Sequence, residues 1–153
     1  MWVEQTHGRL DCGLQGVNEE ASSERFRGLR ILDLSNLRRP VQVGAVQTCR
    51  GSHTHSVVSG AGGNGKILVY YSGTASIRKE EELAGCNDGS AGDDGTARFR
   101  IDVIETPVAH PSRARIVHSP AVFAYPETGV LAGLWRGGDH GDETQETRRT
   151  DQC

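Results

Sequence analysis

Hydrophobic and polar residues alternate along the chain in short runs that are typical of β-strands. The strongest single strand is predicted at Lys66–Ser72, a continuous β-branched and aromatic run between Gly65 and Gly73. Glycine at both ends marks turns on either side of this strand. Runs of the same kind predict strands at Trp2–Gln5, Gly28–Leu34, Val41–Val46, Thr54–Ser59, Lys66–Ser72, Ala97–Glu105 and Ala114–Val117.

Two stretches of the chain are related to each other. In each, an alternating strand runs into a proline-marked turn and then into a second short strand, and Arg30-Ile31 aligns with Arg100-Ile101 at a spacing of 70 residues. Repetition at a fixed spacing is typical of units that bury their apolar faces against one another. Short strands separated by turns favour the blades of a β-propeller or an open β-array.

A propeller blade has four antiparallel strands, A to D. The runs between residues 54 and 117 supply all four, and the earlier runs supply strands C and D of a preceding blade, with Trp2–Gln5 as a remnant of its strand B. The sequence therefore predicts an all-β partial β-propeller of about one and a half blades with long loops. One short helix is expected at Ile77–Ala84, whose charged residues are interpreted as a solvated face.

This pattern divides the chain into three parts. Residues 1–47 hold the outer strands of the preceding blade, residues 48–117 form one blade with a loop insertion at 73–96, and residues 118–153 form a connection towards the next blade. Because a typical propeller closes with 4–8 blades, we expect the sequence to be a fragment whose partners include the remaining blades. Its long connections are expected to open on one face, where binding sites usually lie.

A family resemblance supports the same fold. The segment Leu29–Asp33 resembles the core of the LVIVD-repeat proteins and matches that five-letter pattern at Leu29, Ile31 and Asp33. The second copy departs from it, because Asp102 comes one place early. The resemblance covers nearly the whole chain and implies a bacterial, exported β-propeller without an established reaction; the wider segments that carry it are 26–55, 81–86 and 137–141.

Composition narrows the choice of partner. Only 35% of the residues are hydrophobic and 5% aromatic, while glycine occurs 20 times, which suits a chain rich in turns. A net charge of −3 gives no reason to expect binding to nucleic acid or to an anionic membrane. No apolar run reaches the roughly 20 residues of a membrane span. Residues 1–4 lack a signal-peptide pattern, so we expect any export signal to lie upstream.

The four cysteines favour disulfides over a zinc site, and four unrelated buried thiols are the alternative. Cys12, Cys49, Cys86 and Cys153 match no zinc-finger spacing, and an even number of scattered cysteines is typical of proteins outside the cytosol. We therefore expect an extracellular, periplasmic or cell-surface location. The repeat alignment favours the pairs Cys12–Cys49 and Cys86–Cys153, and the nearest alternative is Cys49–Cys86.

Three histidines are the candidate metal ligands. His53 and His55 are two residues apart, so on a strand both imidazoles would face the same side. His140 lies in a second polar cluster at 137–143 and is the candidate third ligand. The interpretation that we favour is a structural role for the histidine pair and a solvated loop around His140, because two ligands alone do not make a divalent metal site. The metal site is the alternative.

No catalytic motif assembles in the sequence. Neither a GxSxG elbow, a Walker element nor a GxGxxG loop is present. The favoured function is therefore a non-enzymatic binding or surface-interaction module whose ligand is a protein, a glycan or a small molecule. The alternative is a metal-dependent hydrolase or lyase whose ligands come from several blades and include His53 or His55.

Overall fold

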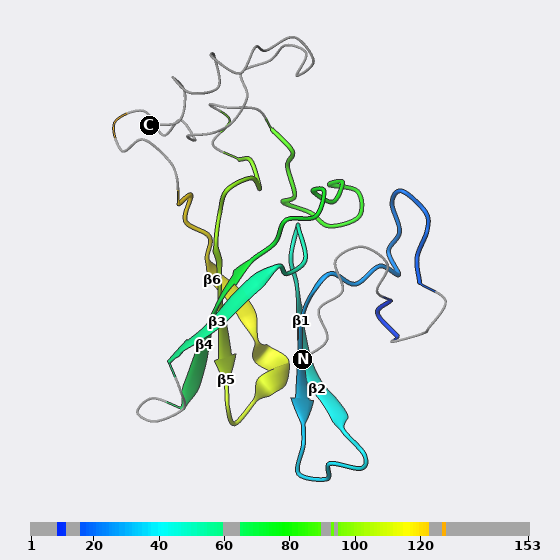
Figure 1. Cartoon of the computed structure of the whole chain (residues 1–153), viewed down its shortest axis with the longest axis vertical. Helices are drawn as coiled ribbons and strands as arrows, with labels where there is room; N and C mark the ends of the chain where they lie inside the picture. Colours follow the sequence, from blue (N-terminus) through cyan, green and yellow to red (C-terminus); the bar gives the residue numbers. More distant parts are fainter. Residues whose placement is uncertain are drawn as a thin grey trace, which may run out of the picture.

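The structure is a computed structural model that describes residues 9–11, 16–59, 65–89, 93, 95–122 and 127. Within these residues it is all-β, as predicted, with two antiparallel sheets and a single 3₁₀ turn (Figure 1). The elements are β1 (Gly28–Asp33), β2 (Val41–Gln47), β3 (Thr54–Ser59), β4 (Lys66–Ser72), β5 (Asp102–Pro107), η1 (Pro111–Arg113) and β6 (Arg115–His118).

The larger sheet is a meander. Its order, β3-β4-β5-β6, follows the sequence, and each strand runs antiparallel to its neighbours. One row of aliphatic residues crosses all four strands, because Val57 pairs with Val69, Val69 with Ile104 and Ile104 with Ile116. The smaller sheet is the hairpin β1-β2. A four-stranded antiparallel sheet was predicted for residues 54 to 117, and its strands lie there almost as expected.

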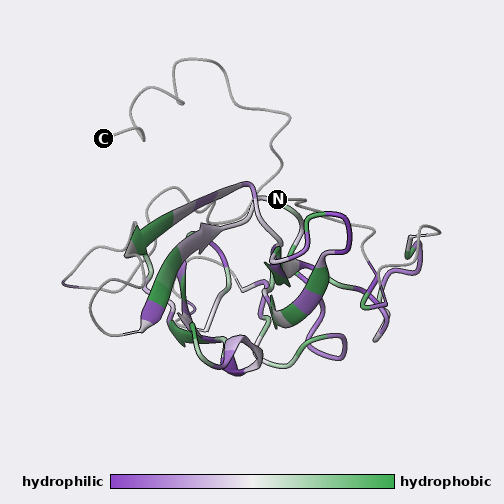
Figure 2. Cartoon of the chain, turned by 90° about the horizontal axis from the view of Figure 1, so that it is seen from below, coloured by the Kyte–Doolittle hydropathy of each residue, from purple (hydrophilic) through white to green (hydrophobic). Residues whose placement is uncertain are grey.

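The two sheets share one hydrophobic core. Leu29 and Val46, which pair across the hairpin, are buried together with Val69, Tyr71 and Ile104 of the larger sheet. The alternation along β5, where every second residue is buried, turns one face of that sheet towards the hairpin. Figure 2 shows hydrophobic segments on the strands of both sheets and hydrophilic residues along the connecting loops.

The turn η1 joins the sheets at one end of the core. It contacts both β2 and β5 (Figure 1). A Cβ atom at Gly44 of β2 would lie 2.4 Å from the carbonyl oxygen of Pro111, so only glycine permits this close approach.

The short helix predicted at Ile77–Ala84 is wrong. These residues form turns instead, with Glu82 N–H donating to the Lys79 carbonyl at 3.0 Å. The backbone N–H of Arg78 donates to the carbonyl of Cys49 at 3.0 Å, so this segment is held by a contact to a distant part of the chain. Tertiary contacts therefore override the helix propensity of this charged run.

The strand predicted at Ala97–Glu105 is displaced towards the C-terminus. Strand β5 begins at Asp102 and ends at Pro107. Phe99 takes a positive φ of 50°, which interrupts the extended backbone before the sheet. A strict shift of 70 residues from β1 would start this strand at residue 98, so the two copies do not keep the same register. The predicted strand Trp2–Gln5 lies outside the described residues.

Candidate functional site

The centre of the candidate site is a disulfide between two connections. Cys49 follows β2 and Cys86 lies between β4 and β5, and their Cα atoms are 5.4 Å apart. Both are buried and form a second small core with Ala97, against which Ile77 and Leu83 pack. This core lies at the end of the larger sheet opposite the β3–β4 turn (Figure 1). A disulfide was therefore predicted correctly for these two cysteines.

The pairing favoured by the repeat alignment is wrong. The structure joins Cys49 to Cys86, the alternative, and thereby excludes Cys12–Cys49 and Cys86–Cys153. The alignment treated the cysteines as one pair per repeat. In the structure, the segment that enters β3 instead crosses the β4–β5 connection of the same sheet and is linked to it there. Cys12 and Cys153 lie outside the described residues.

Hydrogen bonds hold the same two connections together. Arg78 N–H donates to the Cys49 carbonyl at 3.0 Å, and His53 N–H donates to the Ser72 carbonyl at 2.8 Å. The Arg50 side chain donates to two carbonyls of the β4–β5 connection, with Nε 2.8 Å from the oxygen of Ala75. A Cβ at Gly73 would lie 2.4 Å from the Arg50 carbonyl oxygen, so this contact also requires glycine.

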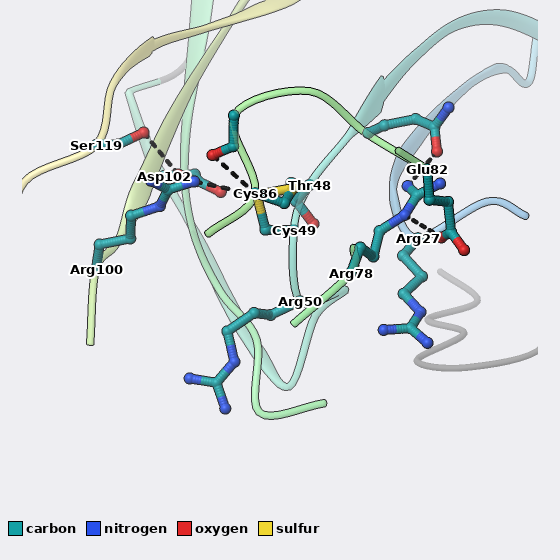
Figure 3. The surroundings of a disulfide bond; sticks show 12 residues. Arg27, Thr48, Cys49, Arg50, Arg78, Glu82, Cys86, Arg100, Asp102 and Ser119 are labelled. Atoms are coloured by element: carbon teal, nitrogen blue, oxygen red, sulfur yellow. Dashed lines mark hydrogen bonds and ion pairs between the residues drawn. A yellow bond between two sulfur atoms is a disulfide. The ribbon is translucent and has the colours of Figure 1, made fainter. Parts of the chain in front are cut away.

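Three buried arginines lie beside the disulfide. Arg25, Arg27 and Arg78 are only 5%, 5% and 3% exposed. The Glu82 carboxylate, whose side chain is fully buried, pairs with Arg78 and lies 3.5 Å from Arg25 Nη1. Figure 3 shows this Arg78–Glu82 pair on one side of the disulfide, with the Arg27 guanidinium turned away from it. Burial lowers the pKa of Arg78, despite the opposing effect of Glu82.

Arg27 is the least compensated of these cations. Its Nη1 donates to the Ser76 carbonyl at 2.7 Å, but its Nε has no hydrogen-bond partner in the described part of the chain, and neither has Arg25 Nε. Burial lowers the pKa of Arg27, and repulsion from Arg25 adds to the effect. Such unpaired buried donors are uncommon in proteins and call for an explanation.

A hollow of about 530 Å³ opens next to these arginines. Its most buried lining residues are the three arginines and Cys86, whereas its outer lining is made of exposed charged residues. The charged and polar residues of the outer lining are Glu20, Ser76, Lys79, Glu80, Glu81, Asn87 and Asp88.

A second buried polar group lies on the other side of the disulfide (Figure 3). The Ser119 hydroxyl donates to the Asp102 carboxylate at 2.7 Å, and Arg100 lies 3.7 Å from the same oxygen while also donating to Cys49 Sγ. Burial raises the pKa of Asp102. Burial likewise raises the pKa of Tyr71, which pairs with Asp102 across the strands, to about 12. Asp102 is buried while Arg100 and Ser119 are half-buried, and their contacts tie β5 to the segment after β6 and to the disulfide.

The two histidines of the metal hypothesis differ in setting. His53 is exposed and lies just before β3, with Nδ1 3.1 Å from Thr54 Oγ1. His55 is half-buried, stacks on Tyr71 and has Nδ1 3.1 Å from Ser52 Oγ. Since Ser52 is fully buried, no substrate reaches its hydroxyl. Among the described residues, no three acidic, histidine or cysteine side chains form a metal-binding group. His140 lies outside the described residues, so the predicted triad stays a prediction.

Comparison with protein-family models, with curated proteins and with solved structures finds no match. The resemblance to the LVIVD-repeat proteins therefore remains an inference from the residues themselves. The described part of the chain contains no helix with the length and hydrophobicity needed to cross a bilayer.

The arginine group was missed by sequence reasoning. Arg78 and Glu82 stand four residues apart in a charged run, a spacing typical of an ion pair on a solvated helix face, yet both side chains are buried. Arg25 and Arg27 lie in an irregular segment before β1, where no periodicity predicts burial. Only their position in the chain could have indicated burial. Arg25 and Arg27 come just before the core strand β1, and Arg78 lies in the segment that leads to Cys86.

Proposed function

We propose that the chain is a repeat segment of an exported β-propeller of the LVIVD type and acts as a non-enzymatic binding module. The observation that carries this proposal is the meander β3-β4-β5-β6, whose inner face packs against a second antiparallel sheet. Successive four-stranded meanders packed in this way are the building units of propellers.

The connections at the disulfide end support the binding part of the proposal. They gather the disulfide, the buried arginines and the hollow at one end of a sheet scaffold. Long connections held on a rigid scaffold are where binding residues are usually found. The Cys49–Cys86 bridge also fits an oxidising location outside the cytosol.

The outer face of the larger sheet provides the test. Tyr70 lies between the buried residues Val69 and Tyr71 of β4, so it points away from the core, and it is 43% exposed. In a propeller the next blade covers this face. In the purified 153-residue chain we expect a second copy to cover it, because open sheet faces and edges promote association.

The experiment is size-exclusion chromatography with light scattering at several micromolar protein concentrations. We expect the wild-type chain to associate and Tyr70→Asp to lower the associated fraction severalfold. Leu37→Asp, which changes a 78%-exposed apolar residue in the turn between β1 and β2, is the matched control and should leave association unchanged. A wild-type monomer with a sharp cooperative melt would overturn the proposal.

Metal analysis separates this proposal from the hydrolase or lyase alternative. We expect His53→Ala and His55→Ala to leave the metal content unchanged. His55→Ala should lower stability by about 1–3 kcal/mol, because Ser52 then loses a partner in a buried setting. Stoichiometric metal that disappears in both variants would replace the binding module with a metal-dependent enzyme.

A further inference from the structure

We propose that the hollow beside the Cys49–Cys86 disulfide binds a small zwitterionic ligand, with a phosphate or carboxylate group on the buried arginines and a cationic group at the rim. This inference rests on the proposed function and names a ligand class for it.

The floor of the hollow has an excess of buried positive charge. It contains Arg25, Arg27 and Arg78, whereas Glu82 is the one buried carboxylate that pairs with any of them in the described part of the chain. Glu82 forms ion pairs with Arg78 and Arg25 but none with Arg27. Because a buried cation is costly without a counter-charge, an anion bound beside Arg27 would compensate it.

The unused donors of this floor have the chemistry that an oxyanion requires. Arg25 and Arg27 each keep a buried Nε–H without a partner among the described residues. The Nε and Nη groups of arginine form a planar fork that matches two oxygens of a phosphate or carboxylate. Figure 3 shows that the Arg27 guanidinium is not engaged by the Arg78–Glu82 pair; its Nη1 is bonded to the Ser76 carbonyl, and its buried Nε is the donor without a partner among the described residues.

The rim has the opposite sign. Four carboxylates line it and are exposed to solvent, with side-chain exposures of 81% at Glu20 and 55% at Asp88. Two of them have cationic partners, Glu20 with Lys79 at 2.7 Å and Asp88 with Arg98 Nε at 2.6 Å, which leaves Glu80 and Glu81 as the excess negative charge. An acidic rim over a basic floor repels a free dianion at the entrance and attracts a cationic group there. A molecule that carries an anionic and a cationic group can bind the arginines of the floor and the carboxylates of the rim at the same time.

The experiment is isothermal titration calorimetry of the full chain, with its disulfide intact, at low salt. The probes are phosphocholine and inorganic phosphate for a phosphate group, glycine betaine and acetate for a carboxylate group, and choline as the cation alone. We expect one zwitterion to bind more tightly than the matching free anion, and choline not to bind. The tighter of phosphocholine and betaine identifies the oxyanion.

The variants locate the site. Arg27→Met should weaken zwitterion binding roughly 10- to 100-fold, the effect of losing a charge-assisted hydrogen bond. Arg50→Met is the matched control, because Arg50 donates to carbonyls of the neighbouring connection and does not line the hollow. It should leave the affinity unchanged.

A rim variant keeps the test valid if Arg27→Met does not fold. Glu81→Gln changes an exposed side chain and should strengthen binding of inorganic phosphate while weakening binding of phosphocholine. Absence of binding by all the anions, or binding that neither Arg27→Met nor Glu81→Gln alters, would overturn the inference. If the calorimetry gives either of these outcomes while the wild-type chain still associates through Tyr70, the ligand class is rejected and the proposed function stands.

Discussion

Two regions of this molecule are held together by different physics. Between the sheets, Leu29, Val46 and Ile104 belong to a core of apolar side chains whose burial is non-directional. At the disulfide end, the buried material is a covalent bridge, the Arg78–Glu82 pair and carbonyls that accept from guanidinium groups. The first region therefore depends on how much apolar surface is covered, whereas the second depends on particular partners being present.

This difference predicts how each region responds to substitution. An apolar core tolerates a small change in volume at modest cost. Removing one member of a buried ion pair costs more stability, because the remaining charge stays buried without water or a counter-charge. The disulfide end should therefore be the more sensitive region, although it contains fewer apolar contacts.

The largest effect is expected from Arg78→Met. This side chain is 1% exposed, pairs with Glu82 and donates Nη2 to the Arg25 carbonyl at 3.1 Å. Removal of the guanidinium takes the nearest counter-charge from the fully buried Glu82 carboxylate, which keeps the Ser22 N–H at 2.9 Å and the longer contact to Arg25, so we expect a loss of about 3–5 kcal/mol in the free energy of unfolding. Urea unfolding followed by circular dichroism measures it.

The double variant Arg78→Met with Glu82→Leu is the control for that experiment. Replacing both members of an isolated buried pair by apolar residues is often neutral or stabilising, but Glu82→Leu also takes the counter-charge from the buried Arg25, so the double variant should recover only part of the loss. A double variant at least as unstable as Arg78→Met alone would show that the lost hydrogen bonds of Arg78 and the uncompensated Arg25, rather than the uncompensated Glu82 carboxylate, account for the effect.

The next largest effect concerns the disulfide. Cys49 and Cys86 are separated by 37 residues, and a bridge that closes a loop of this size contributes about 4 kcal/mol. We expect the Cys49→Ser, Cys86→Ser variant to lose stability of this order. Amide hydrogen exchange should rise first in the connections at 48–53 and 73–101, while β4 and β5 stay protected.

Adding a reducing agent to the wild-type chain is the matched measurement. It should reproduce the loss seen in the double serine variant and have no effect on that variant. Exchange that rises equally in the sheets and in the connections would contradict the division of the molecule into two regions.

The same division explains what could be predicted from sequence. The β-branched and aromatic run between Gly65 and Gly73 located β4 at its observed bounds, and the strand predicted at Thr54–Ser59 likewise matches β3. At the disulfide end no period exists. The helix expected at Ile77–Ala84 failed there, since Arg78 and Cys86 form tertiary contacts that local propensity does not contain.

The sequence did not indicate which residues line the candidate site. The long connections indicated the end of the sheet at which the hollow lies, and Cys49 and Cys86 were recognised as disulfide cysteines. Arg25 and Arg27 were missed because arginine is usually exposed and its burial follows from contacts across the chain. Their pairing depends on segments far apart in sequence, such as the approach of Arg27 to Ser76.

A smaller effect is expected in the apolar region. Ile104 is fully buried at the centre of the row that crosses the larger sheet. Ile104→Val removes one methyl group, and we expect a loss of about 0.5–1.5 kcal/mol by urea unfolding. Val103→Ala, a change at the neighbouring half-buried position on the opposite face, is the comparison and should cost less. If Ile104→Val cost more than Arg78→Met, the proposed ranking of the two regions would be wrong.

The smallest effect is a pH dependence that originates at Asp102. Burial raises the pKa of this carboxyl above its ordinary value of 3.8, so the folded state favours the protonated form. Its contribution to stability is complete below about pH 3.8 and is lost as the pH rises through the folded-state pKa. Asp102→Asn removes this titration and still accepts a hydrogen bond from Ser119. Relative to wild type, the variant should therefore gain stability as the pH rises.

Asp33→Asn should show the opposite trend, because the Ser35 hydroxyl and backbone N–H lower the pKa of the exposed Asp33. Urea unfolding of the three proteins from about pH 3 to pH 7 measures both trends, and a difference between Asp102→Asn and wild type that does not change with pH would show that Arg100 fully compensates the buried carboxylate.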